Sequence, residues 1–212
     1  MQLVKKFEIK SKQKMVDFLN SQPTGRVASI DARDYPQVIP MNFVYADGAV
    51  YMHSHPFGEK LDNIVRNPKV GFEVDQHVCF LPSYYFHPTD ASQADTLYIS
   101  VVIKGTATLV HDNREKAMAL NALMEKYQKE GRYEKLDEHM PAVHEVTVIK
   151  VALDDMRGKY KIGQHWSRPY RLKIAQHIID REGLENARPI LAVIGISLQE
   201  GAALAVERDP EI

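Results

Sequence analysis

The sequence is poor in cysteine, in net charge and in long apolar runs, and each shortage excludes a class of protein. Cys79 is the one cysteine among 212 residues, which excludes a disulfide framework and a four-cysteine zinc site and favours a reducing compartment. With 27 basic and 28 acidic side chains, the chain lacks the basic field that nucleic-acid or acidic-lipid binding usually needs. The longest apolar run, residues 189–198, is too short to cross a bilayer, and the first residues lack the apolar stretch of a secretory signal. We therefore expect a cytoplasmic protein without a membrane or nucleic-acid partner.

The composition that is present, 44% hydrophobic and 26% charged, is that of an ordinary globular protein. Its periodicity predicts short strands interrupted by helices, with connections suited to antiparallel pairing. The expected strands are residues 25–30, 37–45, 49–54, 69–75, 96–110 and 143–153, and the expected helices are residues 11–21, 59–66 and 111–129. Residues 76–95, which contain Pro82 and Pro88, are expected to leave the sheet.

This order of elements favours a mainly β (α+β) fold, a small antiparallel barrel with peripheral helices, over a doubly wound parallel sheet. We expect one domain over residues 1–157. Residues 158–212 differ in character: they begin with a basic run interleaved with aromatics, continue with a helical pattern at 175–181, and include an apolar segment at 189–198 suited to a strand or a buried helix. We expect them to form a C-terminal extension that packs on the barrel or on a partner subunit.

One stretch in the first third of the chain carries the residues best suited to bind a ligand. Pro40 lacks an amide donor, so its strand cannot be fully paired in the middle of a sheet, and its backbone is free to address a ligand. His53 and Ser54 end the returning strand of the hairpin with two side chains able to donate hydrogen bonds. Gly58 leads into a helix whose first turn contains Lys60, and a helix N-terminus beside a lysine suits a phosphate. The sequence thus predicts a site for an elongated, phosphorylated ligand.

Each of these residues also has a purely structural interpretation. Lys60 is equally typical of a solvated helix start, and Ser54 of a turn. His53 and His55 are spaced like metal ligands, but no acidic or cysteine partner follows at a recognised spacing, so no metal site is expected. His53 is either a functional group of the site or a hydrogen-bonded histidine of the barrel wall.

The order and spacing of several sequence blocks point to a known family. The blocks are residues 25–30 with Tyr35-Pro36, VIPMNFVY at 38–45, VYMHS at 50–54, GEKLDNIVRNPKVGFEVD at 58–75 and SVVIKGTA at 100–107. Together they resemble the flavin-binding split-barrel superfamily that includes pyridoxamine 5′-phosphate oxidase, and within it the branch related to nitroimidazole resistance (Nim) proteins. The resemblance covers residues 7–155.

The resemblance implies a six-stranded antiparallel split β-barrel that forms a homodimer, with FMN in the cleft between the subunits. The residues that it assigns to FMN are Val38, Ile39, Pro40, Met41, Asn42, His53, Ser54, Lys60 and Ser100. Lys60 takes the place of the oxidase's phosphate-binding lysine, and Ser100 that of a glutamine that contacts flavin across the dimer. His53 lies where Nim proteins have a histidine in the active cleft, which makes it the candidate catalytic residue.

The sequence departs from the oxidase pattern at three positions. An arginine and a lysine that flank the oxidase's first flavin strand are replaced by Gln37 and Asn42, and a second basic residue beside the phosphate lysine is replaced by Glu59. One positive charge therefore remains for the phosphate, and charge-assisted contacts are the stronger ones.

The basic C-terminal run has two interpretations. Charge runs are usually solvated faces. However, residues 166–172 are similar to the substrate-binding WxxRPxRL segment of the oxidase, and residues 158–164 to the tail of PaiB-type regulators. On this resemblance, Trp166 and Arg168 are expected to cover the cleft and contact the substrate.

The function expected from these resemblances is that of an FMN-dependent oxidoreductase, which reduces a small nitroaromatic- or quinone-like acceptor with electrons from NAD(P)H. The chain has no separate dinucleotide-binding GxGxxG motif, so a nicotinamide donor would have to stack directly on the flavin. Two alternatives stay open: a non-enzymatic flavin carrier or haem binder that uses His53 as a ligand, and a PaiB-like regulator.

Overall fold

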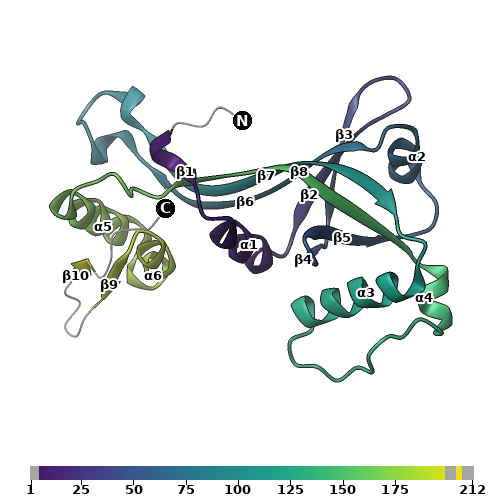
Figure 1. Cartoon of the computed structure of the whole chain (residues 1–212). Helices are drawn as coiled ribbons and strands as arrows, with labels where there is room; N and C mark the ends of the chain where they lie inside the picture. Colours follow the sequence, from purple (N-terminus) through teal and green to yellow (C-terminus); the bar gives the residue numbers. More distant parts are fainter. Residues whose placement is uncertain (1–4, 199–203, 207–212) are drawn as a thin grey trace. The chain divides into compact units, whose positions relative to one another are not determined.

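Figure 1 shows the computed structural model of the chain, which describes residues 5–198 and 204–206. The strands are β1 (Glu8–Ile9), β2 (Gly25–Ile30), β3 (Pro36–Met41), β4 (Val44–Ala46), β5 (Ala49–Ser54), β6 (Lys69–Leu81), β7 (Asp95–Leu109), β8 (Thr147–Lys161), β9 (Ile196–Leu198) and β10 (Leu204–Val206). The α-helices are α1 (Lys12–Ser21), α2 (Glu59–Arg66), α3 (Asn113–Tyr127), α4 (Pro141–Glu145), α5 (Arg168–Glu182) and α6 (Leu184–Val193). Short 3-10 helices lie at Lys5–Phe7, Ser83–Tyr85 and Ala91–Gln93.

The sheet has the mostly antiparallel arrangement of a split barrel, which confirms the predicted fold class. Its strand order is β3-β2-β6-β7-β8-β5-β4, and β1 pairs with β8 outside this path. It has more strands than the six expected, because the expected strand 37–45 is divided into β3 and β4 and because the short β1 is added. β9 and β10 form a separate antiparallel pair.

The chain divides into two compact units. The larger unit contains residues 12–74 and 101–157, and the smaller unit contains residues 1–11, 75–100 and 158–212. Strands β6, β7 and β8 each contribute residues to both. Residues from 158 onward therefore share their unit with two earlier segments of the chain.

One hydrophobic cluster of the larger unit lies between α3 and the strands β4, β5 and β8. Its buried members are Val44, Ala49, Tyr51, Val110, Ala119, Leu123 and Val148. Nearby, the rings of Phe43 and Phe72 meet edge to face, with centroids 5.0 Å apart. A Cβ at Gly25 would lie 2.1 Å from the Phe72 ring, so β2 can approach this ring only with glycine at its first position.

The C-terminal end of α3 fixes the corner between β3 and β4. The Tyr127 hydroxyl accepts a hydrogen bond from the Phe43 backbone N–H (2.8 Å) and donates to the Pro23 carbonyl (2.7 Å). The Lys126 ammonium lies 3.5 Å from the centroid of the Phe43 ring and donates to the Leu19 carbonyl (3.1 Å). Burial lowers the pKa of Lys126 to about 8. These contacts hold the chain directly after β3, the strand that the sequence predicts to line the ligand.

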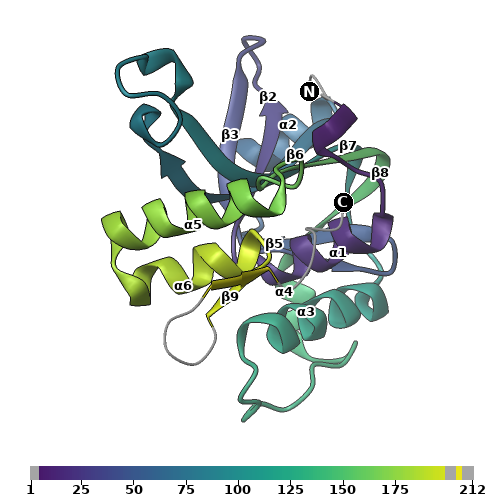
Figure 2. The ribbon, with the colours of Figure 1, turned by 90° about the vertical axis from the view of Figure 1, so that its left-hand side faces the viewer.

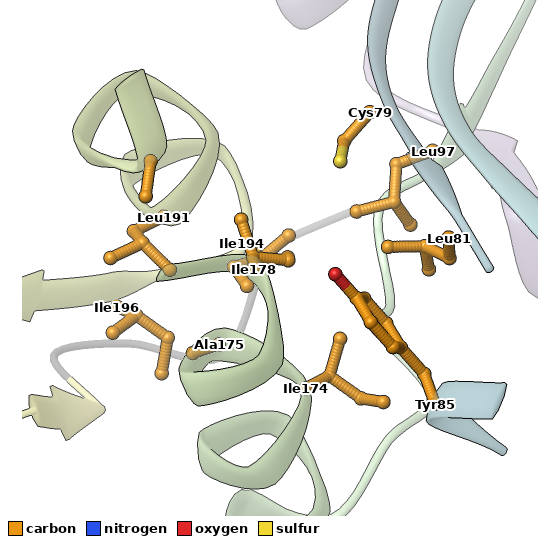
Figure 3. Packing of buried hydrophobic residues seen from close by; sticks show 11 residues of the cluster. Cys79, Leu81, Tyr85, Leu97, Ile174, Ala175, Ile178, Leu191, Ile194 and Ile196 are labelled. Atoms are coloured by element: carbon orange, nitrogen blue, oxygen red, sulfur yellow. The ribbon is translucent and has the colours of Figure 1, made fainter. Parts of the chain in front are cut away.

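The core of the smaller unit is formed by α5 and α6 together with the ends of β6 and β7. The two helices lie side by side (Figure 2). Tyr85 lies beside Leu81 and Ile174 (Figure 3), and its hydroxyl donates to the His177 carbonyl (2.8 Å). Cys79 belongs to this core, and its burial raises the pKa of the thiol, consistent with a small apolar residue rather than a nucleophile.

The structure corrects three of the expected elements. β6 continues to Leu81, beyond the expected end at residue 75. Polar residues such as Asp75 and His77 occupy its exposed positions, and they hid the alternation of the strand in the sequence. The last barrel strand begins at Thr147, since Pro141 starts the short helix α4. The apolar segment 189–198 is divided between α6 and β9. None of the helices in the described part of the chain combines the length and apolar composition of a membrane-spanning segment.

We expect Tyr127→Phe to lower the free energy of unfolding by about 1–3 kcal/mol, because the N–H of fully buried Phe43 loses its acceptor. Urea unfolding monitored by circular dichroism measures the change. Tyr133→Phe is the control, since no hydrogen bond to the Tyr133 hydroxyl exists within the described residues. Equal stabilities of the two variants would show that Tyr127 does not hold this corner.

Candidate functional site

β3 is an edge strand with two different faces. It pairs with β2 alone and ends the strand order of the sheet, which confirms that the strand of Pro40 is not a central one. Gln37, Ile39 and Met41 are half-buried, whereas Val38 is 58% exposed. Side chains alternate along a strand, so the three half-buried residues share one face.

The hydrogen-bond register of β3 shows which backbone groups are free. The Asp31 N–H donates to the Tyr35 carbonyl (2.8 Å), which makes this pair a hydrogen-bonded one. Bonded and non-bonded pairs alternate in an antiparallel ladder, so Pro36, Val38 and Pro40 are non-bonded and direct their backbone groups away from β2. The outer edge of β3 therefore presents three carbonyls and the Val38 N–H.

Helix α2 begins with Lys60 in its first turn, as predicted. Its N-cap, Gly58, has φ 140° and ψ 155°, a conformation that is almost restricted to glycine. Lys60 is half-buried, and burial lowers the pKa of its ammonium. Its Nζ lies 3.6 Å from the Met41 sulfur, and no carboxylate among the described residues forms an ion pair with it. A desolvated cation at a helix N-terminus is suited to an anionic ligand.

A polar network holds α2 on the β2–β3 hairpin. Asn63, 1% exposed, donates to the Ser29 hydroxyl (3.4 Å) and to Gln37 Oε1 (3.2 Å). Gln37 Nε2 donates to the Glu59 carboxylate (2.6 Å). Arg66 donates to Asn63 Oδ1 (3.1 Å) and to the Ile30 carbonyl (2.5 Å). Sequence reasoning missed Asn63, because a single asparagine in a short amphipathic helix carries no signal of burial.

His53 and Ser54 end strand β5, where they pair with Val148 and Thr147 of β8. The His53 ring is exposed, and no described residue forms a hydrogen bond or ion pair with it. The Ser54 hydroxyl donates to the neighbouring His55 carbonyl (3.0 Å). Of the predicted site residues, Lys60 and Met41 are in contact, but neither His53 nor Ser54 contacts either of them directly. Asn42 is exposed and directly follows β3.

Three of the predicted site residues belong to the smaller unit. Ser100 is half-buried in β7. Trp166 contacts the rings of His165 and Tyr170, each with centroids 5.9 Å away, and Arg168 is the exposed first residue of α5. Their contribution to a site on the larger unit stays a prediction. In residues 5–198 and 204–206, no three His, Cys, Asp or Glu side chains lie where they would share a metal ion.

The chain is similar to known proteins in sequence and in fold. The family model described as pyridoxamine 5′-phosphate oxidase matches residues 11–160. A solved structure from Bacteroides thetaiotaomicron, described as a 5-nitroimidazole antibiotic resistance protein, is 29% identical with a TM-score of 0.61, over 72% of this chain and 85% of that one. No curated protein sequence matches the chain.

Two further solved structures share the fold at lower identity. A flavocytochrome from Azotobacter vinelandii has a TM-score of 0.63 at 16% identity, over 76% of this chain and 72% of that one. An FAD and haem binding protein from Mycobacterium smegmatis has a TM-score of 0.60 at 16% identity, over 72% of each chain. At these identities the similarity concerns the fold alone.

We expect Gly58→Ala to cost about 1–3 kcal/mol of unfolding free energy, because alanine is strained at this φ and ψ. Nothing lies within 4 Å of the added Cβ, so the effect is one of backbone conformation. Gly48→Ala is the matched control: it has the same open surroundings and a φ of 77°, in the milder left-handed region. A smaller loss for Gly58→Ala than for Gly48→Ala in thermal unfolding would contradict this view of the α2 start.

Proposed function

The chain belongs to the pyridoxamine 5′-phosphate oxidase family, and on this premise we propose that it binds FMN with the phosphate at Lys60 and acts as a flavin-dependent oxidoreductase. The observation that carries the proposal is the half-buried Lys60 ammonium, which has no carboxylate partner among the described residues. Burying a cation without a counter-charge is costly, and a bound phosphate removes that cost.

The residues around Lys60 fit a flavin phosphate. The first N–H groups of a helix have no acceptor in a preceding turn. In α2, the N–H groups of Leu61 and Asp62 donate to the carbonyl of the N-cap residue Gly58. The N–H groups of Glu59 and Lys60, which precede them, are left to point out of the helix start. Together with the Lys60 ammonium, they provide donors for phosphate oxygens.

The free edge of β3 fits the ring system of a flavin. The flavin's pyrimidine edge carries both carbonyl acceptors and an N–H donor. The Val38 N–H supplies a donor, and the outward carbonyls of Pro36, Val38 and Pro40 supply acceptors. The β3 backbone would orient the ring, while Met41 borders the phosphate end through its contact with Lys60.

When bound, the flavin supplies transfer of a hydride or of single electrons between a donor and an acceptor. We propose that NAD(P)H is the donor and that a small nitroaromatic- or quinone-like compound is the acceptor. His53 presents an exposed ring that is free to hydrogen-bond a ligand, which supports its assignment as the candidate catalytic residue. Trp166 and Arg168 keep their proposed role of covering the substrate.

The visible spectrum of the purified protein, repeated on the supernatant after denaturation, tests the proposal. Two flavin bands, with FMN released on denaturation, support it, and oxidation of NADPH in the presence of a quinone then tests turnover. A Soret band would identify the bound cofactor as haem and not FMN. A colourless protein that takes up no added FMN would overturn the proposal and leave a regulator as the alternative, tested by salt-dependent retention on DNA.

We propose further that the chain forms a homodimer with the flavin at the subunit interface. Four exposed apolar side chains of the larger unit support this: Tyr35 at 65%, Val38 at 58%, Phe57 at 80% and Val65 at 71%. They lie on β3, on α2 and next to these two elements, where a second chain would cover them. Sedimentation equilibrium should give the mass of two chains, and Val38→Lys should shift the protein toward monomer and weaken FMN binding together. A wild-type monomer that binds FMN tightly would overturn the interface.

We expect Lys60→Met to raise the Kd for FMN by roughly 10- to 150-fold, the equivalent of about 1.5–3 kcal/mol for a hydrogen bond to a charged group. Riboflavin, which lacks the phosphate, should bind equally well to both proteins. Titration by flavin fluorescence quenching measures both constants.

Lys69→Met is the control, because Lys69 is exposed on β6 and its ammonium forms no hydrogen bond or ion pair within the described residues. If Lys60→Met retains FMN as well as Lys69→Met does, the phosphate does not bind at Lys60.

A further inference from the structure

Lys60 and Glu59 are adjacent in sequence, yet they contact opposite ends of β3. The Glu59 carboxylate accepts a hydrogen bond from Gln37 Nε2 (2.6 Å), whereas the Lys60 ammonium lies 3.6 Å from the Met41 sulfur. Gln37 and Met41 lie on the same face, near the two ends of the strand. Glu59 and Lys60 form no ion pair with each other in the described part of the chain. The two opposite charges are therefore bound to different residues of β3 and not to each other.

The Gln37 amide is held in one orientation by a buried residue. Its Oε1 accepts from Asn63 Nδ2, so its Nε2 is directed at Glu59. Asn63 is in turn fixed, because its Nδ2 also donates to Ser29 and its Oδ1 accepts from Arg66. A relay of oriented amides thus runs from the buried side of α2 to the Glu59 carboxylate.

Without this relay, the Glu59 carboxylate has an oppositely charged neighbour in the Lys60 ammonium. Lys60 is half-buried and has no carboxylate partner in the described part of the chain, and the two side chains leave the same helical turn. The other charged groups of this region do not compete: Asp62 is exposed, Arg66 bonds to Asn63 and to Ile30, and the facing β3 residues are uncharged. A released Glu59 carboxylate would pair with the Lys60 ammonium.

We propose that Gln37, oriented by Asn63, is a positioning residue that keeps the Glu59 carboxylate away from Lys60 and thereby leaves the ammonium free to bind a phosphate. The phosphate part of this statement rests on the proposed function. The relay itself is a property of α2 and β3 and is testable without any flavin.

The first experiment measures the Kd values of FMN and riboflavin for the wild type, Gln37→Leu, Glu59→Gln and the double variant. Gln37→Leu should weaken FMN binding about tenfold, which corresponds to 1.4 kcal/mol, while riboflavin binding stays the same. Glu59→Gln alone should change little, and in the double variant it should restore FMN binding, because no carboxylate remains to pair with Lys60.

Three results would overturn the relay. Loss of FMN and riboflavin alike in Gln37→Leu, or no restoration in the double variant, would show that Gln37 acts only on the fold. Tighter FMN binding in Glu59→Gln alone would show that Glu59 already pairs with Lys60 in the wild type.

The second experiment follows the titration of Lys60 by NMR of 13C-labelled lysine, assigned with Lys60→Met. The pKa should be equal in the wild type and in Glu59→Gln, and higher in Gln37→Leu because of the new ion pair. A lower pKa in Glu59→Gln than in the wild type would refute the separation, whether or not Gln37→Leu folds. Should FMN bind no tighter than riboflavin to the wild type, the phosphate site fails, and this titration still decides the relay.

Discussion

The packing of α2 against the β2–β3 hairpin is the contact on which the candidate site depends. It desolvates Lys60, directs the first turn of the helix toward the end of β3, and buries Asn63 among polar partners. A buried amide whose hydrogen-bonding groups are unsatisfied costs free energy, so the network favours one position of α2 on the hairpin. The position of the lysine is thus set by a buried asparagine one turn further along, not by the lysine itself.

The site also depends on contacts that involve none of its own residues. β3 ends where the chain turns at Phe43, and this corner is held by Tyr127 and Lys126 at the C-terminal end of α3, more than 80 residues later in the sequence. The edge position of β3 then leaves Pro36, Val38 and Pro40 without a ladder partner on one side. A proline pattern that would weaken a central strand becomes, at an edge, a row of backbone groups available to a ligand.

On our proposal, neutral amides separate the charges at the phosphate site. A single lysine, Lys60, would bind the phosphate, and its effectiveness would depend on where the adjacent Glu59 carboxylate is held. Amides suit this role because they bind a carboxylate without adding a charge that would compete for the phosphate. In this proposal, the chain retains an acidic residue in the first turn of α2, where it interacts favourably with the helix dipole, and keeps Lys60 available to an anion.

The sequence by itself determined the local elements and the chemistry at their ends. The Gly58–Lys60 helix start, the Pro40 edge strand and the apolar stripe of α3 follow from backbone sterics and periodicity, which act over a few residues. Tertiary structure alone decided the extension of β6 to Leu81, the burial of Asn63, and the pairing of Glu59 with Gln37 rather than with Lys60. These depend on which distant residues share a face, and desolvation and hydrogen-bond satisfaction are decided only once the segments pack together.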